Sequence, residues 1–265
     1  MRQQSNAELL VALDFDGTLA AIVDDPRATR PVVGVLEAIA QLGDAGAHVA
    51  SISGRPLDFL VQHFGSLMEH DWFTLVGEYG IERVHAGVRS SEPFPQHMAD
   101  ALAAARDEAT TQGPVGMSVE AKPHSMTLHY RTAPEAQTAV QFFADELAKR
   151  HGLETRPAKM SIELHPIVSN SKGTALTALL QDLTGQTNHQ FPVVFIGDDV
   201  GDLPAFRVLS ELRARQWEVV SVVVQSAESS PELLAHADLL LDGPDAVVQY
   251  LHSVVASDLQ VVNGL

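Results

Sequence analysis

The chain has 265 residues, of which 45% are hydrophobic, and its 34 acidic and 17 basic residues give a formal net charge of −17. This size predicts one large folded domain, or a domain that carries a smaller insertion. The negative charge argues against nucleic acid and anionic membranes as partners. The lack of cysteine excludes disulfides, thiolate nucleophiles and cysteine-ligated zinc. No apolar run is long enough to span a membrane and residues 1–6 lack a signal-peptide pattern, so we expect a cytoplasmic protein.

The first predicted element is a strand over residues 9–13, followed by the sequence DFDGTL at residues 14–19. Its continuous apolar run is typical of a central strand in a parallel sheet. Asp14 and Asp16 point to the same side of the extended chain, and Gly17 lets the backbone turn with its N–H groups exposed. Two such carboxylates stay ionised around a cation, for which Mg²⁺ with a substrate phosphate is the natural candidate. Asp14 can then attack phosphorus while Asp16 transfers protons; the alternative is a simple turn or helix cap.

The sequence DFDGTL resembles the signature of haloacid-dehalogenase-type phosphatases, in which the first Asp is the nucleophile and the second is the general acid/base. A helix predicted from about Pro31 leads to a second strand and the sequence SGR at residues 53–55, which predicts a parallel sheet with right-handed crossovers. This sequence resembles the second motif of the family, which implies that Ser53 and Gly54 contact the phosphate, although Ser53 alone would suit a helix cap. Arg55 either neutralises substrate charge or forms a surface ion pair.

A third strand over residues 72–76 ends in the sequence GEYG at residues 77–80. Trehalose-6-phosphate phosphatases, which the later segments resemble, usually have Gly-x-His-Gly here. Tyr79 is therefore a departure, and it either hydrogen-bonds a sugar or packs at the sheet edge.

The pattern changes after residue 80 to short strands, at 81–84, 116–120, 124–131 and 161–165, and to helices at about 95–112 and 134–151. Because these elements lie between two stretches with catalytic signals, we predict an inserted α+β cap domain over 81–166, with the catalytic core at 1–80 and 167–265. The sequences VEAK at 119–122 and IELHP at 162–166 resemble the cap motifs of trehalose-6-phosphate phosphatases. The resemblance implies that Glu120, Lys122 and Glu163 bind sugar hydroxyls; without it they would be ordinary solvent-facing residues.

The chain then returns to the core with a helix that opens on Ser171 and Lys172. A lysine in the first turn lies near the positive end of the helix, where an anion is needed to balance it. Lys172 resembles the third motif of the family, which implies that it holds the phosphate and the nucleophile, although Ser171 replaces a common Asp. The alternative is a surface lysine near a helix cap.

A fourth core strand over residues 192–197 ends in the acids Asp198 and Asp199, followed by Asp202. Asp198 resembles the metal ligand of the fourth motif, and the other two resemble groups that orient water or the lysine. The family usually has Gly-Asp-Asp-x-Thr-Asp-Glu here, so Gly201 and Leu203 are departures. Strands at 219–224 and 237–241 and a helix at 244–255 complete the predicted sheet.

The predicted fold is α/β, a Rossmann-like parallel sheet core with an inserted α+β cap. The resemblance covers nearly the whole chain and implies Mg²⁺-dependent hydrolysis of trehalose 6-phosphate through an aspartyl-phosphate, the last step of trehalose biosynthesis. It implies that Asp14, the main-chain carbonyl of Asp16 and Asp198 hold the Mg²⁺. We expect a monomer whose small-molecule substrate is supplied by a trehalose-6-phosphate synthase.

Other functions stay open at this point. The substrate can be another sugar phosphate, such as sucrose phosphate, glucosylglycerol phosphate or mannosyl-phosphoglycerate. The chain can also be a phosphomutase, or a sensor that binds a sugar phosphate without turnover.

Overall fold

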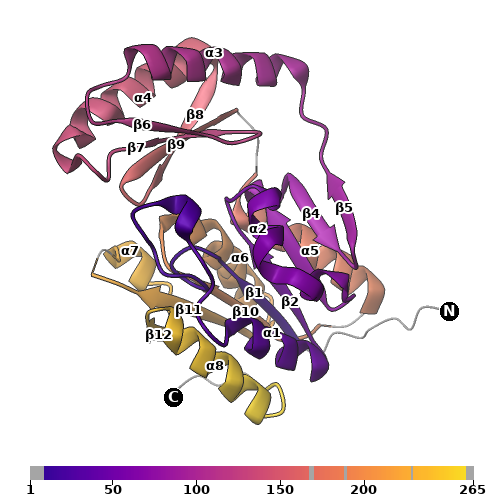
Figure 1. The fold of residues 1–265 in the computed structure, drawn as a ribbon. Coiled ribbons are helices and arrows are strands. Elements are labelled where there is room, and N and C mark those ends of the chain that lie inside the picture. The colour runs from indigo at the N-terminus through magenta and orange to yellow at the C-terminus, as the bar shows by residue number, and fades with distance from the viewer. Residues whose placement is uncertain (1–8, 167–169, 188–189, 228, 261–265) are drawn as a thin grey trace. The chain divides into compact units, whose positions relative to one another are not determined.

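The structure is a computed structural model that describes residues 9–166, 170–187, 190–227 and 229–260. The chain forms two compact units, which we call the core unit (Met1–Ser91 with Asn170–Leu265) and the inserted unit (Glu92–Ser169). Each unit combines helices with a sheet (Figure 1). The predicted α/β core with an inserted α+β domain is therefore confirmed.

The core unit contains an eight-stranded sheet with the strands β1 (Leu9–Leu13), β2 (Ala47–Ile52), β3 (Phe73–Gly77), β4 (Glu82–His85), β5 (Val88–Ser91), β10 (Val193–Gly197), β11 (Val219–Gln225) and β12 (Leu239–Asp242). Their order across the sheet is β12-β11-β10-β1-β2-β3-β4-β5. The strands from β12 to β3 run parallel, whereas β4 pairs antiparallel with both β3 and β5. The carboxyl ends of β10, β1 and β2 consequently lie side by side at one edge.

Helices cover both faces of this sheet (Figure 1). One face packs against α1 (Val35–Asp44), α2 (Leu57–Phe64) and α8 (Pro244–Ala256), and the other against α5 (Lys172–Thr187), α6 (Leu203–Ala214) and α7 (Pro231–Leu234). The 3₁₀ turns of this unit are η1 (Pro26–Ala28), η2 (Gly65–Glu69), η3 (Glu78–Gly80) and η5 (Val200–Asp202).

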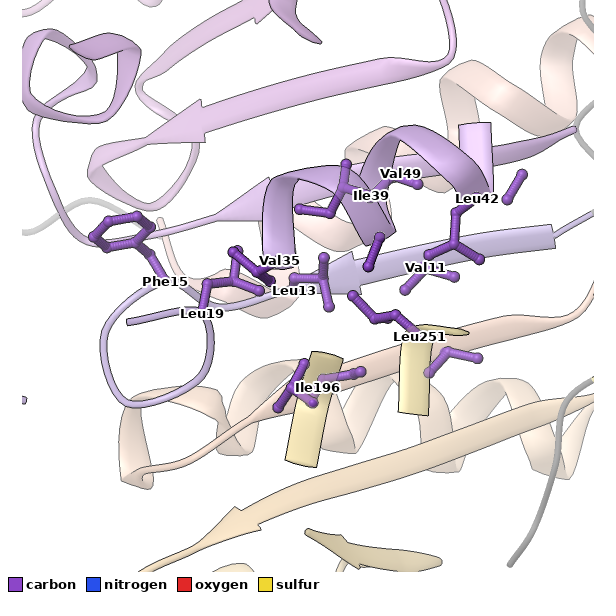
Figure 2. Packing of buried hydrophobic residues seen from close by; sticks show 14 of the residues in the cluster. Val11, Leu13, Phe15, Leu19, Val35, Ile39, Leu42, Val49, Ile196 and Leu251 are labelled. Atoms are coloured by element: carbon purple, nitrogen blue, oxygen red, sulfur yellow. The ribbon is translucent and has the colours of Figure 1, made fainter. Parts of the chain in front are cut away.

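The central strand β1 is buried at every residue, because both of its faces are covered. Val11 and Leu13 point toward the apolar side of α1, which carries Ile39 and Leu42 (Figure 2). Leu10 and Ala12, on the opposite face, pack with α5 and α6. The register of β1 against β10 and β2 places the sequence that follows β1 at the carboxyl-terminal end of the sheet.

The inserted unit contains a four-stranded antiparallel sheet with the order β6-β7-β9-β8. Its elements are β6 (Ser118–Ala121), β7 (Met126–His129), β8 (Leu153–Ala158), β9 (Ser161–Pro166), α3 (Gln96–Gln112), α4 (Gln137–His151) and the turn η4 (Pro134–Ala136). Leu128 and Leu164 lie on the face of the sheet that packs against the helices, through Leu102 of α3 and Leu147 of α4. The opposite face of the sheet carries polar residues.

Three details differ from the sequence predictions. The segment at 81–84, predicted to open the cap, is β4, which pairs with β3, so the core sheet extends to Ser91 and the boundary at residue 80 was placed too early. The core sheet is also not parallel throughout, because β4 is antiparallel to both of its neighbours, β3 and β5. Finally, β8 and α6 were not predicted. None of the helices in the described segments is long and apolar enough to cross a membrane.

Candidate active site

The core unit gathers the predicted catalytic residues at the carboxyl ends of three neighbouring strands. Asp14 follows β1, Ser53 follows β2 and Asp198 follows β10, and all three side chains are buried. Lys172 is the first residue of α5, which packs on the same sheet. Open α/β sheets bind their ligands at this edge, so the sheet topology brings the predicted motifs together.

The ammonium of Lys172 connects two of the predicted acids. Its Nζ lies 2.7 Å from Oδ1 of Asp14 and 2.6 Å from Oδ1 of Asp202. Burial alone would lower the pKa of Lys172, but these two carboxylates raise it well above its usual value. Lys172 is therefore a permanently charged group, and the surface-lysine alternative is wrong.

Asp202 organises the turn after β10. Its Oδ2 accepts hydrogen bonds from the backbone N–H groups of Asp198 (2.9 Å) and Asp199 (3.1 Å), while Asp199 accepts one from the N–H of Gly201 at 2.7 Å. Together these bonds form a capping box around η5. Because Gly201 contributes only its backbone N–H, its departure from the family pattern leaves the turn intact.

The acidic cluster is short of positive charge. Within the described residues, oxygens of Asp14, Asp198 and Asp202 all lie within 4.8 Å of one another. Burial raises the pKa of Asp14 to about 8, against the opposing effect of Lys172, and burial together with the neighbouring carboxylate of Asp199 raises the pKa of Asp198. One lysine does not balance three buried carboxylates, so a hard divalent cation with oxygen ligands fits this donor set.

The backbone after Asp16 lies close to the same cluster. A Cβ added to Gly17 would be 2.0 Å from Oδ2 of Asp198, and Gly17 has a φ of +81°, so a glycine is required here for two reasons. Asp202 is already bound to Lys172 and to the backbone, which suits the predicted outer position.

The phosphate-loop candidates lie directly after β2. Ser53 is 1% exposed, and its Oγ accepts a hydrogen bond from the N–H of Arg55 at 3.1 Å. The hydroxyl hydrogen can still be donated, because an oxygen that accepts a bond keeps its own O–H. The backbone N–H of Tyr79 donates to the carbonyl of Ser53 at 3.0 Å, so the turn at Glu78–Gly80 supports this loop.

Arg55 forms an ion pair, one of the two roles considered from the sequence. Its Nε donates to Oδ2 of Asp16 at 2.7 Å and its Nη2 donates to Oδ1 at 2.6 Å. The side chain of Arg55 is only 12% exposed, so the pair is more than a surface contact.

The predicted sugar-binding residues form a second cluster within the inserted unit. The cross-strand register places Glu120, Thr127, Glu163 and Arg156 opposite one another on β6, β7, β9 and β8. Glu163 is 2% exposed, and its Oε1 lies 2.9 Å from Nζ of Lys122. Although burial raises the pKa of Glu163, the charges of Lys122 and Arg156 outweigh it and lower that pKa to about 2. Glu120 pairs with Nε2 of His129 at 2.7 Å.

Sequence reasoning missed several members of both clusters. Arg156, which lies 3.7 Å from Oε2 of Glu163, was missed together with its strand β8. Ser125, whose hydroxyl donates to Glu163 at 2.8 Å, belongs to no motif. Thr29, a contact of Arg55, lies in a segment with only turn signals. Each of these residues is recognised only by a contact with a residue far away in the sequence, and a motif of neighbouring residues does not contain that information.

Comparisons with known proteins agree with this architecture. The chain is 30% identical over 250 residues to the trehalose-phosphate phosphatase of Mycobacterium ulcerans (strain Agy99), an alignment that covers 91% of this chain and 60% of the relative. It is 31% identical over 250 residues to that of Mycobacterium tuberculosis (strain H37Rv), with 91% and 59% covered. The chain thus spans about 60% of the length of these curated relatives.

Solved structures give the same grouping. The C-terminal domain of C. albicans trehalose-6-phosphate phosphatase superposes with a TM-score of 0.74 at 23% identity, covering 95% of this chain and 93% of that one. The Aspergillus fumigatus trehalose-6-phosphate phosphatase superposes with a TM-score of 0.62 at 26% identity, covering 94% and 93%. The family described as "Trehalose-phosphatase" matches residues 12–238, which are most of the chain. The chain therefore belongs to the trehalose-phosphatase family.

Proposed function

We propose that the chain hydrolyses trehalose 6-phosphate to trehalose and inorganic phosphate, with Asp14 as the nucleophile. The observation that carries this proposal is the buried cluster in which Lys172 bridges Asp14 and Asp202 beside Asp198. Such a cluster can bind a phosphoryl group only if its negative charge is offset, and family membership supports a phosphate monoester as the ligand.

Asp14, the carbonyl of Asp16 and Asp198 would hold a Mg²⁺ ion, which when bound neutralises charge on the phosphoryl oxygens. Lys172 offsets negative charge on both Asp14 and the phosphoryl group, while the hydroxyl of Ser53 donates to a phosphoryl oxygen. The carboxylate of Asp14 attacks phosphorus and forms an aspartyl-phosphate as the bond to the sugar oxygen breaks. Asp16 gives a proton to that sugar oxygen, and afterwards takes one from the water that releases phosphate from Asp14.

The inserted unit would determine which sugar is accepted. Glu120 and Glu163 offer carboxylate oxygens to sugar hydroxyls, and Lys122 offers an ammonium. Because Glu163 is ionised and held by Lys122, its oxygens are fixed before a sugar arrives. The cytoplasmic location, the monomeric state and the supply of substrate by a synthase stay predictions.

The test is phosphate release from a panel of sugar phosphates, with Mg²⁺, by the native protein and by Asp14→Asn. We expect preferential release from trehalose 6-phosphate and none from the variant. A short-lived phosphoryl adduct, trapped by acid quench in the native protein and absent from Asp14→Asn, would support the covalent step. Preference for sucrose phosphate or another sugar phosphate would contradict the substrate, and equal release by both proteins would contradict the nucleophile. Tight binding without release would indicate a sensor instead.

A further inference from the structure

The guanidinium of Arg55 and the carboxylate of Asp16 are joined by two parallel hydrogen bonds, of 2.7 and 2.6 Å. The pair connects the loop that follows β1 with the loop that follows β2. Two parallel bonds fix the plane of a carboxylate as well as its position, whereas one bond would let it rotate. Asp16, whose side chain is 33% exposed, is therefore held in one orientation although solvent reaches it.

Arg55 is itself fixed by further contacts. Its Nη1 donates to the carbonyl of Pro26 at 2.9 Å, and its Nη2 donates to Oγ1 of Thr29 at 3.2 Å. The guanidinium carbon also lies 4.5 Å from the centre of the Phe59 ring, a cation–π distance. Two segments of the core unit, the loop with Pro26 and Thr29 and the helix α2 with Phe59, thus hold the side chain of Arg55, which in turn holds Asp16.

This arrangement does not suit a phosphate ligand. Arginine binds phosphate through a pair of neighbouring N–H groups, and here the Nε and Nη2 pair is directed at Asp16. Asp16 keeps its capacity to act, because each carboxylate oxygen has a second lone pair beside the one that accepts from Arg55. One oxygen can therefore carry the proton that the sugar oxygen takes in the first step, and accept the proton of the water in the second. A water molecule or a leaving-group oxygen can therefore still reach Asp16 while the ion pair stays formed.

We propose that Arg55 is a positioning residue that holds Asp16 in place for proton transfer, and that it is not a ligand of the phosphoryl group. The inference rests on the proposed function. There, the bond from phosphorus to the sugar oxygen breaks as Asp14 attacks and the proton of Asp16 passes to that oxygen. Water then attacks phosphorus, its proton passes to Asp16 and the bond from Asp14 to phosphorus breaks. Arg55 acts on both steps only through the carboxylate of Asp16.

The experiment compares two leaving groups. A sugar alkoxide needs a proton as it leaves, whereas p-nitrophenolate leaves readily without one, so only the sugar substrate depends on Asp16 in the first step. For Arg55→Ala we expect kcat/KM for trehalose 6-phosphate to fall by about 10- to 100-fold, while kcat/KM for p-nitrophenyl phosphate changes by less than about threefold. The inhibition constant of inorganic phosphate should stay the same. Equal losses with both substrates, with weaker inhibition by phosphate, would identify Arg55 as a phosphate ligand and overturn the proposal.

A double-mutant cycle provides a second measurement. If Arg55 acts only through Asp16, then Arg55→Ala has no further effect on kcat/KM in an Asp16→Asn background, and an additional loss there overturns the proposal. Arg55→Lys keeps the charge but loses the two-point geometry, so it should show the same selective loss even if Arg55→Ala does not fold. Millimolar guanidinium ion should restore part of the sugar-phosphate activity of Arg55→Ala.

The matched control is Arg83→Ala, which breaks another Arg–Asp pair of the core unit, from Arg83 of β4 to Asp182 of α5; β4 holds no proposed catalytic residue. It should leave both substrates unaffected. Failure of the proposed function would look different: the native protein would release no phosphate from any sugar phosphate, and the positioning role would fall with it. Phosphate release by the native protein with unselective losses in the variants would overturn the role of Arg55 alone.

Discussion

The ring of Tyr79 lies directly against the backbone of Gly54: a Cβ added to Gly54 would be 2.5 Å from both Cζ and the hydroxyl oxygen of the tyrosine. Tyr79 has a φ of 60°, in the left-handed region that non-glycine residues rarely adopt. Its N–H donates to the carbonyl of Ser53, so both the backbone and the ring of Tyr79 contact the candidate phosphate loop. Strained backbone of this kind persists where the surrounding structure holds it in place, often at functional sites.

We expect Gly54→Ala to lower kcat/KM for every phosphate ester, by about 10- to 100-fold, because the new methyl group must displace either the ring of Tyr79 or the loop itself. Removing the ring should relieve the clash, so Gly54→Ala with Tyr79→Ala should be more active than Gly54→Ala alone. Gly185→Ala is the control, since a Cβ at that helical glycine meets open space. Steady-state kinetics give the answer, and an unimpaired Gly54→Ala would contradict the steric argument.

Tyr79→Phe separates the two roles that the sequence left open for this residue. Packing against Gly54 needs only the ring, so a structural role predicts kinetics within about twofold of the native protein. A hydrogen bond from the phenol to the sugar predicts a higher KM for trehalose 6-phosphate and an unchanged KM for p-nitrophenyl phosphate. Because the ring already has a packing role, we expect the first result, and a selective rise in KM would contradict it.

Asp14→Asn should make the metal-free protein more stable although it abolishes activity. Burial, with the nearby carboxylates, makes an ionised Asp14 unfavourable in the folded metal-free protein and raises its pKa to about 8. Asparagine removes this cost, while Lys172 keeps its contact with Asp202. In EDTA we expect the variant to melt a few degrees above the native protein, which corresponds to a gain of about 1 kcal/mol or more in the free energy of unfolding. Added Mg²⁺ should stabilise the native protein more than the variant, since the variant has lost a ligand. A lower melting temperature in EDTA would contradict the charge imbalance.

The sequence was sufficient for the core motifs because their arrangement follows from topology. Asp14, Ser53 and Asp198 each follow a buried strand, and the carboxyl ends of parallel strands meet at one edge of the sheet. Neither the partner of Arg55 nor the bridge from Lys172 to Asp202 could be chosen this way. Each depends on side-chain directions across loops that are far apart in the chain.

The strands that the sequence missed or assigned to the wrong unit share a different cause. Strand β5 is exposed at every residue, so it has no apolar alternation to mark it, and β4 was assigned to the wrong unit for lack of that partner. Strand β8 contains Pro157, which is unfavourable within a sheet but tolerated here because β8 is an edge strand that pairs only with β9. These two edge strands therefore gave the sequence pattern little to detect.

Glu163→Gln tests the cluster of the inserted unit. The substitution leaves Lys122 and Arg156 without their buried carboxylate. Removing one partner of a buried ion pair lowers the free energy of unfolding by about 3–5 kcal/mol. It also removes a fixed acceptor for sugar hydroxyls, so we expect KM for trehalose 6-phosphate to rise by about tenfold or more, while kcat/KM for p-nitrophenyl phosphate is kept. Ser125→Ala, which removes one hydrogen bond to Glu163, is the milder control. Equal losses with both substrates would contradict a role in sugar recognition.

The stability of the core unit should fall as the pH drops below about 6, and His48 is a specific cause. His48 is 2% exposed, its Nε2 lies 2.9 Å from Oγ1 of Thr74, and Thr74 in turn contacts Nδ1 of His85 at 3.1 Å. Burial, followed by the nearby charges of His85 and Arg83, lowers the pKa of His48 from 6.5 to about 3. The unfolded chain therefore binds one more proton than the folded chain between these two values.

The contribution of neutral His48 to the free energy of unfolding is complete above pH 6.5. It is lost, at about 1.4 kcal/mol per pH unit, as the pH falls toward 3. His48→Gln keeps a polar group within reach of Thr74 but does not titrate. Its free energy of unfolding should therefore fall less steeply as the pH drops, by the slope that corresponds to about one bound proton. Both tryptophans, Trp72 and Trp217, belong to the core unit, so urea unfolding followed by their fluorescence at pH 7, 6 and 5 measures this unit specifically. His252→Gln, at an exposed position, should keep the native slope. If His48→Gln keeps it too, the acid sensitivity arises elsewhere in the core.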